Sequence, residues 1–351
     1  MGGPRVLVIG GTGFMGRHVV QGLLDAAVHV EMITEGKVPN PWGERVPETI
    51  CDRHDPCLGQ ILKQGPWTLV VDFPVFGASD VDIILEHEDW IKHYIFPSSD
   101  DVYMVCDRAQ FRYGAADSLL EQSAVRPKNK SERMMLDAWD SYGDGKKCLE
   151  ERFAASAMNF TALRLPDVWG PFESTGRFTT FLRALLRGLS IGLRIQSGNP
   201  VFRTGALGDA FRPGLVFAKD VAQMVLLLLR IGPQQKPLNV AVSESPTFLE
   251  LLIATHRKLQ EILGATPMPE LRVSDQKPVP LLSTDIGPLA IDLASSLGFK
   301  PTPWRQGWEE TVAALFQDAR NDSLAASELA KCMKHCDMVC ACEASPTALL
   351  I

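Results

Sequence analysis

The amino-acid sequence predicts an α/β fold organised around a Rossmann-type doubly wound parallel sheet. Short apolar runs alternate with segments of helical periodicity, as in sheets whose parallel strands are joined by helices. The first apolar run is followed by three glycines at intervals of three residues. The 351 residues, 46% of them hydrophobic, are enough for a large core. A smaller α/β domain and a C-terminal helical tail complete the predicted architecture.

The first predicted strand runs from Val6 to Ile9 and leads into Gly10, Gly13, Gly16 and a helix over residues 17–26. Gly10 permits a tight turn, Gly13 lets a pyrophosphate approach the backbone, and Gly16 lets the helix pack closely. The helix N-terminus would point its N–H groups at the phosphates. The predicted dinucleotide-binding residues of this turn are Gly10, Thr12, Gly13, Phe14, Met15 and Gly16. The alternative is a glycine turn that only packs a strand on a helix.

An acidic residue, Glu35, ends the second predicted strand, which runs from Val28 to Thr34. A carboxylate about 20 residues beyond the glycines accepts hydrogen bonds from the adenosine ribose, which favours NAD as the cofactor. Lys37 lies close by and could instead meet the 2′-phosphate of NADP. A solvated turn residue is the third interpretation of Glu35.

Three more strands and two helices are expected before residue 100. They are a short strand closed by residues 51–55, a helix from Asp55 to about Lys63, a strand from Trp67 to Phe73, a helix from Ser79 to about His87 and a strand from His93 to Pro97. Ligands of such a sheet bind at the carboxyl ends of its strands, so the residues that follow the strands are candidate site residues.

A serine after the fifth strand and a later tyrosine–lysine pair are candidates for catalysis. Tyr142 and Lys146 are four residues apart and would share one face of a helix. An ammonium beside a phenol favours the phenolate and lowers the pKa of the tyrosine, which makes Tyr142 a candidate general acid or base. Ser99 is the candidate hydroxyl that orients a substrate oxygen. The alternative is an ordinary surface pair of side chains.

The order of these motifs resembles the extended (atypical) short-chain dehydrogenases/reductases, the family of NAD-dependent epimerases and dehydratases. The resemblance covers roughly residues 5 to 318 and rests on Gly10-x-x-Gly13-x-x-Gly16, Ser98-Ser99-x-x-Val-Tyr103 and Tyr142-x-x-x-Lys146. Further matching segments are Leu163 to Pro171, Phe217 to Ala222, Leu238 to Ala241 and Leu297 to Pro301. Leu69 to Phe73 replaces a more usual pair of alanines, which resembles a branch that includes the chloroplast stem-loop-binding proteins, relatives that bind RNA.

The resemblance implies a set of cofactor ligands beyond the glycine turn. Glu35 would bind the adenosine ribose and Asp52 the adenine, while Lys146 would bind the nicotinamide ribose. Phe73, which ends the fourth predicted strand, is a further predicted cofactor-binding residue.

The resemblance also implies catalytic roles. Tyr142 would be the acid/base, and Ser99 would bind the substrate. Asp100 and Asp101 stand where sugar dehydratases carry an acidic pair, one carboxyl group protonating a leaving hydroxyl and the other removing a carbon-bound proton. The alternative is two solvated loop carboxylates.

The substrate side departs from the family's pattern. Asp167 stands where sugar-processing members often have Asn, and Arg212 lies near the position of an arginine that grips the substrate's pyrophosphate. Both are candidate substrate ligands, although Pro213-Gly214 shifts the alignment by about one residue. The basic stretch 126–133 lengthens the connection before Tyr142 and is interpreted as a solvated loop rather than a phosphate or partner site.

The expected domains follow from the same comparison. Residues 1–170 form the dinucleotide-binding domain, with 215–243 returning to it, and 171–214 with 244–318 form the substrate-side domain. Residues 319–351 are predicted to form a tail that is an amphipathic helix, in which Ala325, Leu329, Cys332, Cys336 and Val339 make a narrow apolar stripe. The tail would dock on its own domain or on a partner. A disordered tail is the second interpretation, and a metal site is disfavoured because the thiols lie along one helix.

Composition excludes some classes of function. The net charge of −7 argues against broad, non-specific binding to nucleic acid, so RNA is not the favoured partner. No apolar run is long enough to span a membrane, and no signal peptide is visible. Eight cysteines, scattered and then clustered, do not resemble a secreted disulfide framework. They indicate a reducing compartment, either the cytoplasm or an organelle interior such as the chloroplast stroma or the mitochondrial matrix.

The sequence is therefore compatible with two functions. The favoured one is an NAD(P)-dependent enzyme of the epimerase/dehydratase kind, acting on a hydroxyl of a nucleotide sugar or a related small molecule. The alternative is a non-catalytic or RNA-binding scaffold subunit of a larger organellar assembly that retains the fold. A homodimer or a subunit of a complex is expected in either case.

Overall fold

The computed structural model describes residues 3–176, 191–192, 212–264, 279–280, 284 and 286–321. The chain divides into two compact units, one of Met1–Val168, Gly214–Ser245 and Ile286–Pro303, and one of Trp169–Pro213, Pro246–Asp285 and Trp304–Ile351. Residues 286–303, expected in the substrate-side domain, group with the first unit. The cysteine stripe of the predicted tail lies outside the described residues, as does most of the segment 171–214.

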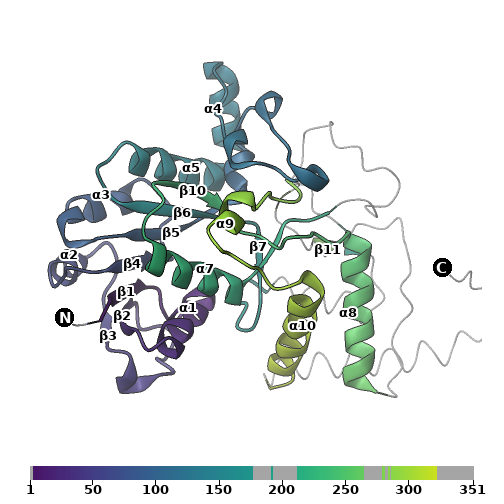
Figure 1. Cartoon of the computed structure of the whole chain (residues 1–351), viewed down its shortest axis with the longest axis horizontal. Coiled ribbons are helices and arrows are strands. Elements are labelled where there is room, and N and C mark those ends of the chain that lie inside the picture. Colours follow the sequence, from purple (N-terminus) through teal and green to yellow (C-terminus); the bar gives the residue numbers. More distant parts are fainter. Residues whose placement is uncertain are drawn as a thin grey trace, which may run out of the picture. The chain divides into compact units, whose positions relative to one another are not determined.

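The first unit is built on a seven-stranded parallel sheet in the order β10-β6-β5-β4-β1-β2-β3 (Figure 1). Its strands are β1 (Arg5–Ile9), β2 (His29–Thr34), β3 (Glu48–Ile50), β4 (Leu69–Asp72), β5 (Tyr94–Ser99), β6 (Phe160–Leu165) and β10 (Lys236–Asn239). The predicted doubly wound α/β fold is thereby confirmed. The strand order reverses between β1 and β4, which is where ligands of such sheets bind.

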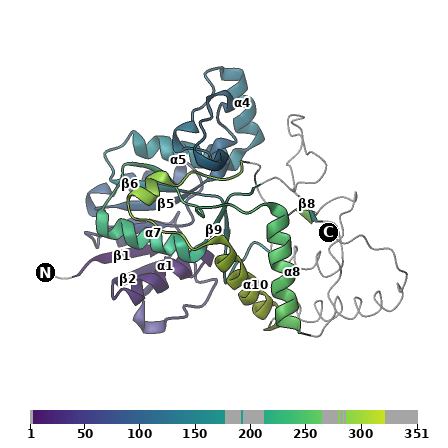
Figure 2. The same ribbon diagram turned by 45° about the vertical axis from the view of Figure 1, so that its right-hand side comes forward.

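Helices cover both faces of this sheet. Those of the first unit are α1 (Phe14–Asp25), α2 (Cys57–Leu62), α3 (Ser79–Leu85), α4 (Lys130–Trp139), α5 (Ser141–Ala154), α7 (Ala218–Ile231) and α9 (Asp292–Ser296). α1 and α7 lie side by side on one face (Figures 1 and 2).

The remaining described strands are short: β7 (Asp167–Trp169) pairs with β9 (Leu215–Phe217), and β8 (Ile191–Gly192) pairs with β11 (Val279–Pro280).

Alternate residues of each central strand supply two separate cores. Val6 and Val8 of β1 pack with α1 and α7, whereas Leu7 and Ile9 of the same strand pack with α2, α3 and α5. Successive side chains of a strand point to opposite faces, so an uninterrupted apolar run is required where both faces are covered. This is why β1 is apolar from Val6 to Ile9.

The second unit contains a helix pair, α8 (Phe248–Leu263) and α10 (Trp304–Asn321), which pack against each other (Figure 2). Thr247 caps α8 and exchanges hydrogen bonds with Glu250 in a capping box. Trp308 of α10 is fully buried and donates from Nε1 to Thr255 Oγ1 at 2.8 Å. No described helix of the chain is both long and apolar enough to cross a membrane.

A buried histidine makes the first unit sensitive to acid. His93 immediately precedes β5, and its Nε2 lies 2.9 Å from Thr161 Oγ1. Burial lowers the pKa of His93 from 6.5 to about 4, because the charged imidazolium loses its hydration. The unfolded chain therefore binds a proton between these two pH values that the folded chain does not bind. The stabilisation is complete above pH 6.5 and is lost as the pH falls towards 4.

We predict that acidification from pH 7 to pH 5 lowers the free energy of unfolding by about 2 kcal/mol through His93 alone. Denaturant titrations of wild type and His93→Gln at the two pH values measure this contribution. The glutamine variant should lose this part of the pH dependence, while the exposed His29→Gln control should keep it. An equal slope in wild type and His93→Gln would contradict the assignment.

Candidate functional site: a dinucleotide cradle beside a Ser–Tyr–Lys set

The turn between β1 and α1 has the geometry that its glycines predict. Gly10 has φ +82°, a backbone conformation that disfavours any other residue. A Cβ on Gly16 would overlap the backbone of Gly10 and stand 2.9 Å from Gly11 Cα. The third glycine therefore lets α1 pack against the turn itself.

The N-terminus of α1 is open to a ligand. Gly13 is the N-cap, and no side chain caps the helix or adds an acidic group to its first turn. Its orphan N–H groups and the positive end of the helix dipole favour an anion there. Gly13 is exposed, Phe14 and Met15 are partly buried, and Thr12 is buried in the turn. These residues leave a cradle of backbone N–H groups that suits a pyrophosphate.

Glu35 lies at the carboxyl end of β2, where the sequence places it, and it is exposed. Its carboxylate forms an ion pair with the Lys37 ammonium, and this pairing raises the pKa of Lys37. The two residues proposed for opposite cofactor choices thus contact each other, and a ribose hydroxyl would have to compete with Lys37 for Glu35.

Asp52 and Phe73 follow β3 and β4 at the same edge of the sheet. The backbone N–H of Phe73 donates to Ile9 O at 3.1 Å, so this residue lies beside the glycine turn. Asp52 is exposed, and its Oδ1 accepts a hydrogen bond from the His54 N–H at 2.9 Å. Both residues therefore lie at the edge of the sheet that also carries the glycine turn.

A buried charge cluster behind this edge is not foreseen by the sequence. Arg53 donates to both oxygens of Asp72, at 2.9 and 3.1 Å, and to the backbone oxygen of Asp80 at 3.0 Å. Tyr94 adds a hydrogen bond to Asp72 at 2.7 Å. Burial raises the pKa of Tyr94 well above its usual value, and the adjacent Asp72 carboxylate adds to this effect. The cluster joins the loop after β3 to the end of β4.

Ser99 caps a 3₁₀ turn formed by Asp100–Tyr103 at the end of β5. Its hydroxyl donates to Asp101 Oδ2 at 2.6 Å and accepts from the Asp101 N–H at 3.2 Å. Asp100 is buried and lies 3.2 Å from the same hydroxyl, whereas Asp101 is partly exposed. The serine and the acidic pair are thus one hydrogen-bonded group, and the interpretation of two separate solvated carboxylates does not describe Asp100.

Tyr142 and Lys146 lie on one face of α5, with Lys146 Nζ 5.7 Å from the centre of the Tyr142 ring. Tyr142 is exposed at 44%, so its phenol is accessible. Lys146 is buried and donates to the backbone oxygens of Val75 at 2.6 Å and Pro97 at 2.8 Å. Phe76 covers the ammonium at 4.9 Å. Burial lowers the pKa of Lys146 to about 8.

Two glycines between the tyrosine and the lysine let α5 approach this edge closely. A Cβ on Gly143 would stand 3.0 Å from the Asp101 carbonyl carbon, and one on Gly145 would stand 2.7 Å from Phe76 O. Each glycine inside a helix costs about 1 kcal/mol relative to alanine. The close approach to the loops after β4 and β5 explains why the helix carries both.

A buried network fixes α5 against the sheet. Arg164 of β6 donates two hydrogen bonds to Glu150 of α5, at 2.9 and 2.7 Å, and Ser98 donates to the same carboxylate at 2.7 Å. Arg164 also donates to Tyr103 Oη at 3.0 Å, and that hydroxyl donates to Asn239 Oδ1 at 2.7 Å. Burial alone would raise the pKa of Glu150, but the Arg164 guanidinium outweighs it and the pKa is lowered. Burial raises the pKa of Tyr103 to about 12.

The two candidate substrate ligands, Asp167 and Arg212, belong to different units of the chain. Asp167 is buried at the start of β7, and Arg212 is an exposed residue of the second unit. Arg126, from the basic stretch expected to be solvated, is only partly exposed, and its guanidinium is paired with the carboxylates of Asp137, Asp144 and Glu151 at 2.7 to 2.9 Å. It therefore holds α4 and α5 together. Within the described ranges, no group of three or more His, Cys, Asp or Glu could hold a metal ion.

Comparison with known proteins identifies the fold. No protein-family model matches the chain, and no curated protein matches it by sequence. Among solved structures, it is similar to a UDP-glucose 4-epimerase from Thermotoga maritima with UDP-glucose, at 20% identity and a TM-score of 0.63 over 90% of this chain and 99% of that one. It is also similar to a Thermus thermophilus UDP-glucose 4-epimerase in complex with NAD, at 20% identity and a TM-score of 0.62, over 89% of this chain and 99% of that one. A third similar structure is a Bacillus anthracis dTDP-glucose 4,6-dehydratase in complex with NAD, at 14% identity and a TM-score of 0.62, over 90% of this chain and 97% of that one. At these identities the likeness establishes the fold.

We predict that Glu150→Gln destabilises the protein by about 3 kcal/mol, because Arg164 is left buried without a counter-charge. Glu151→Gln is the matched control: its carboxylate is exposed on the same helix, and its loss should cost about 1 kcal/mol or less. Denaturant unfolding measures both values. Equal destabilisation of the two variants would show that the Glu150–Arg164 pair does not anchor α5.

Proposed function

We propose that the chain binds NAD and acts as an epimerase/dehydratase-like oxidoreductase on a hydroxyl of a nucleotide sugar or a related small molecule. The observation that carries the proposal is the turn after β1, whose glycines and uncapped helix suit a pyrophosphate. Solved structures of similar fold support it: two of those named above are complexes with NAD, and one holds UDP-glucose.

The residues at the strand ends supply the rest of a dinucleotide site in this proposal. Glu35 takes the adenosine ribose, Asp52 the adenine, and Phe73 packs beside the glycine turn. Lys146 has two N–H groups on backbone oxygens, and its third takes the nicotinamide ribose. Lys37 is the contact through which NADP would be accepted instead, at the expense of its ion pair with Glu35.

NAD, when bound, supplies transient acceptance of a hydride from the substrate. Tyr142 takes the proton from the substrate hydroxyl, because its phenol is exposed and an ammonium lies beside its ring. Lys146 holds its charge below about pH 8, so its support of a phenolate weakens above that pH. Ser99 orients the substrate oxygen through its hydroxyl.

The acidic pair adds a second proton-transfer function to the proposal. Asp101 is partly exposed and Asp100 is buried, so the two carboxyl groups lie in different environments. Different environments separate acid and base roles in paired carboxyl groups. We assign Asp101, which the substrate can reach, to the first proton transfer of a dehydration.

Substrate specificity and assembly are extensions of the same proposal. Arg212 would pair with a substrate phosphate, and Asp167 would stand near the substrate. The chain would work as a homodimer or as a subunit of a complex, in a reducing compartment such as the cytoplasm or an organelle interior. The segment proposed to contact a partner, residues 320–351, lies outside the described residues except for its first two.

We predict that Tyr142→Phe lowers turnover by about 10²- to 10⁴-fold, the usual contribution of a general acid/base. NAD affinity should stay within about threefold, because the ring and Lys146 remain. The assay follows conversion in a panel of nucleotide sugars with full-length protein, and calorimetry follows NAD binding.

Tyr113→Phe is the matched control, since Tyr113 is also exposed but belongs to the connection between β5 and α4 rather than to α5. It should be fully active. Full activity of Tyr142→Phe would overturn the assignment of the base. NAD binding without conversion of any sugar would instead favour the non-catalytic scaffold, whose association with a large complex should then depend on residues 320–351.

A further inference from the structure

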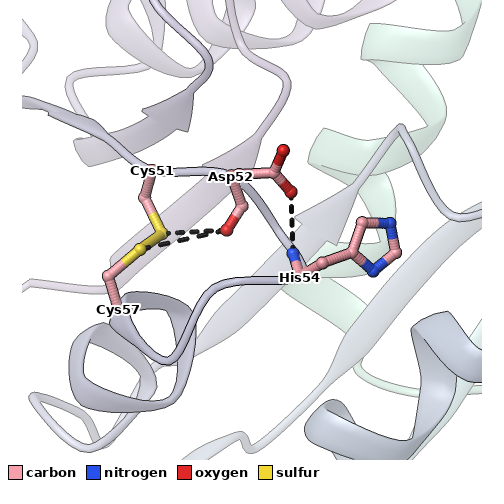
Figure 3. The surroundings of a disulfide bond; sticks show 4 residues. All are labelled: Cys51, Asp52, His54 and Cys57. Carbon is pink, nitrogen blue, oxygen red and sulfur yellow. Dashed lines mark hydrogen bonds between the residues drawn. A yellow bond between two sulfur atoms is a disulfide. The ribbon is translucent and has the colours of Figure 1, made fainter.

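A disulfide joins Cys51 and Cys57 in the loop that follows β3 (Figure 3). Cys51 is buried and continues the pairing of β2 with β3 through its N–H, which donates to Thr34 O at 2.8 Å. Cys57 is the first residue of α2 and is partly exposed. The bond therefore ties a strand end to the start of a helix, and it encloses only five residues.

The enclosed loop carries Asp52, the residue proposed to contact adenine. Its carboxylate is oriented by the His54 N–H (Figure 3). Its backbone oxygen lies 3.2 Å from Cys51 Sγ and 3.9 Å from Cys57 Sγ. Either thiol can donate to that oxygen once the disulfide is reduced, so opening the bond changes the contacts of Asp52 itself.

The loop keeps a second anchor that does not depend on the disulfide. Arg53 is buried and bonded to Asp72 and to the backbone of Asp80. Reduction therefore loosens the segment without releasing it from the sheet, and a graded change in ligand affinity is expected rather than loss of the fold.

We propose that Cys51 and Cys57 form a thiol–disulfide switch that sets the affinity of the chain for the adenosine half of its dinucleotide. The inference rests on the proposed dinucleotide site. The cysteine pattern of the sequence predicts a reducing compartment, where disulfides are usually transient and redox-sensing rather than structural. Because both sulfurs lie beside the Asp52 backbone oxygen, reduction of the bond changes the surroundings of a residue proposed to contact the dinucleotide.

The reductant is a dithiol, either a small molecule or a protein. Its thiolate attacks Cys57 Sγ, the more accessible sulfur. The S–S bond breaks with its electron pair on Cys51 Sγ, which takes a proton from solvent. The second thiol of the reductant then displaces Cys57 Sγ, which is protonated in turn. Two electrons and two protons pass to the cysteines, and the reductant leaves as a disulfide.

The disulfide-bonded form of the chain binds the dinucleotide more tightly than the reduced form. A loop held in its bound conformation loses less freedom when the ligand arrives. We expect the Kd for NAD to rise about fivefold when the disulfide is reduced, because Arg53 preserves most of the loop's position.

The test compares full-length protein after treatment with oxidised glutathione and after treatment with dithiothreitol. Alkylation followed by peptide mass spectrometry should label Cys51 and Cys57 only in the reduced sample. Calorimetric titration with NAD should give the fivefold weaker affinity in that sample. Cys57→Ser should bind like the reduced wild type under both conditions, and the Cys148→Ser control should keep the redox response.

The outcomes separate this inference from the proposed function. Equal NAD affinity in the two redox states, or labelling of both cysteines in both states, overturns the switch and leaves the dinucleotide site standing. Absence of NAD binding in both states overturns the dinucleotide site and the switch together. A redox response that persists in Cys57→Ser assigns the effect to other cysteines and also overturns the proposal.

Discussion

The buried pair of Glu150 and Arg164 is the interaction on which the candidate site depends. It places the carboxylate of α5 against the guanidinium of β6. Ser98 also donates to Glu150, and Arg164 also donates to Tyr103 Oη and to Glu121 O. Such a pair is costly to break because one charge is then left unsolvated. Glu150 lies one helical turn beyond Lys146 and two beyond Tyr142, so anchoring it fixes where both present their polar groups.

Close backbone approach is the second constraint, and it is met by glycine at both helices of the site. Gly16 lets α1 pack on its own turn, and Gly143 and Gly145 let α5 meet the loops after β5 and β4. The strand-order reversal between β1 and β4 provides the edge at which these elements converge. Apolar side chains cover both faces of the sheet, and the candidate site residues lie where the strands end.

Local patterns were sufficient for the fold and for part of the site. The apolar run before Gly10 and the four-residue spacing of Tyr142 and Lys146 predict a strand, a turn and one helix face without tertiary information. The Arg53–Asp72 and Glu150–Arg164 pairs could not be predicted, because partners 19 and 14 residues apart meet only when the sheet register is known. For the same reason the sequence could not show that Lys146 is buried on backbone oxygens or that Cys51 pairs with Cys57.

The most direct test of the account is a calorimetric titration of NAD into wild type and Gly13→Ala. The new methyl group would meet only Gly10 O at 3.3 Å, a contact that small shifts relieve, so the variant should fold. The same methyl group would stand where the pyrophosphate approaches the backbone. The account predicts one NAD per chain for wild type and at least about tenfold weaker binding for the variant. Equal affinity, or no binding by wild type, would contradict a dinucleotide cradle at this turn.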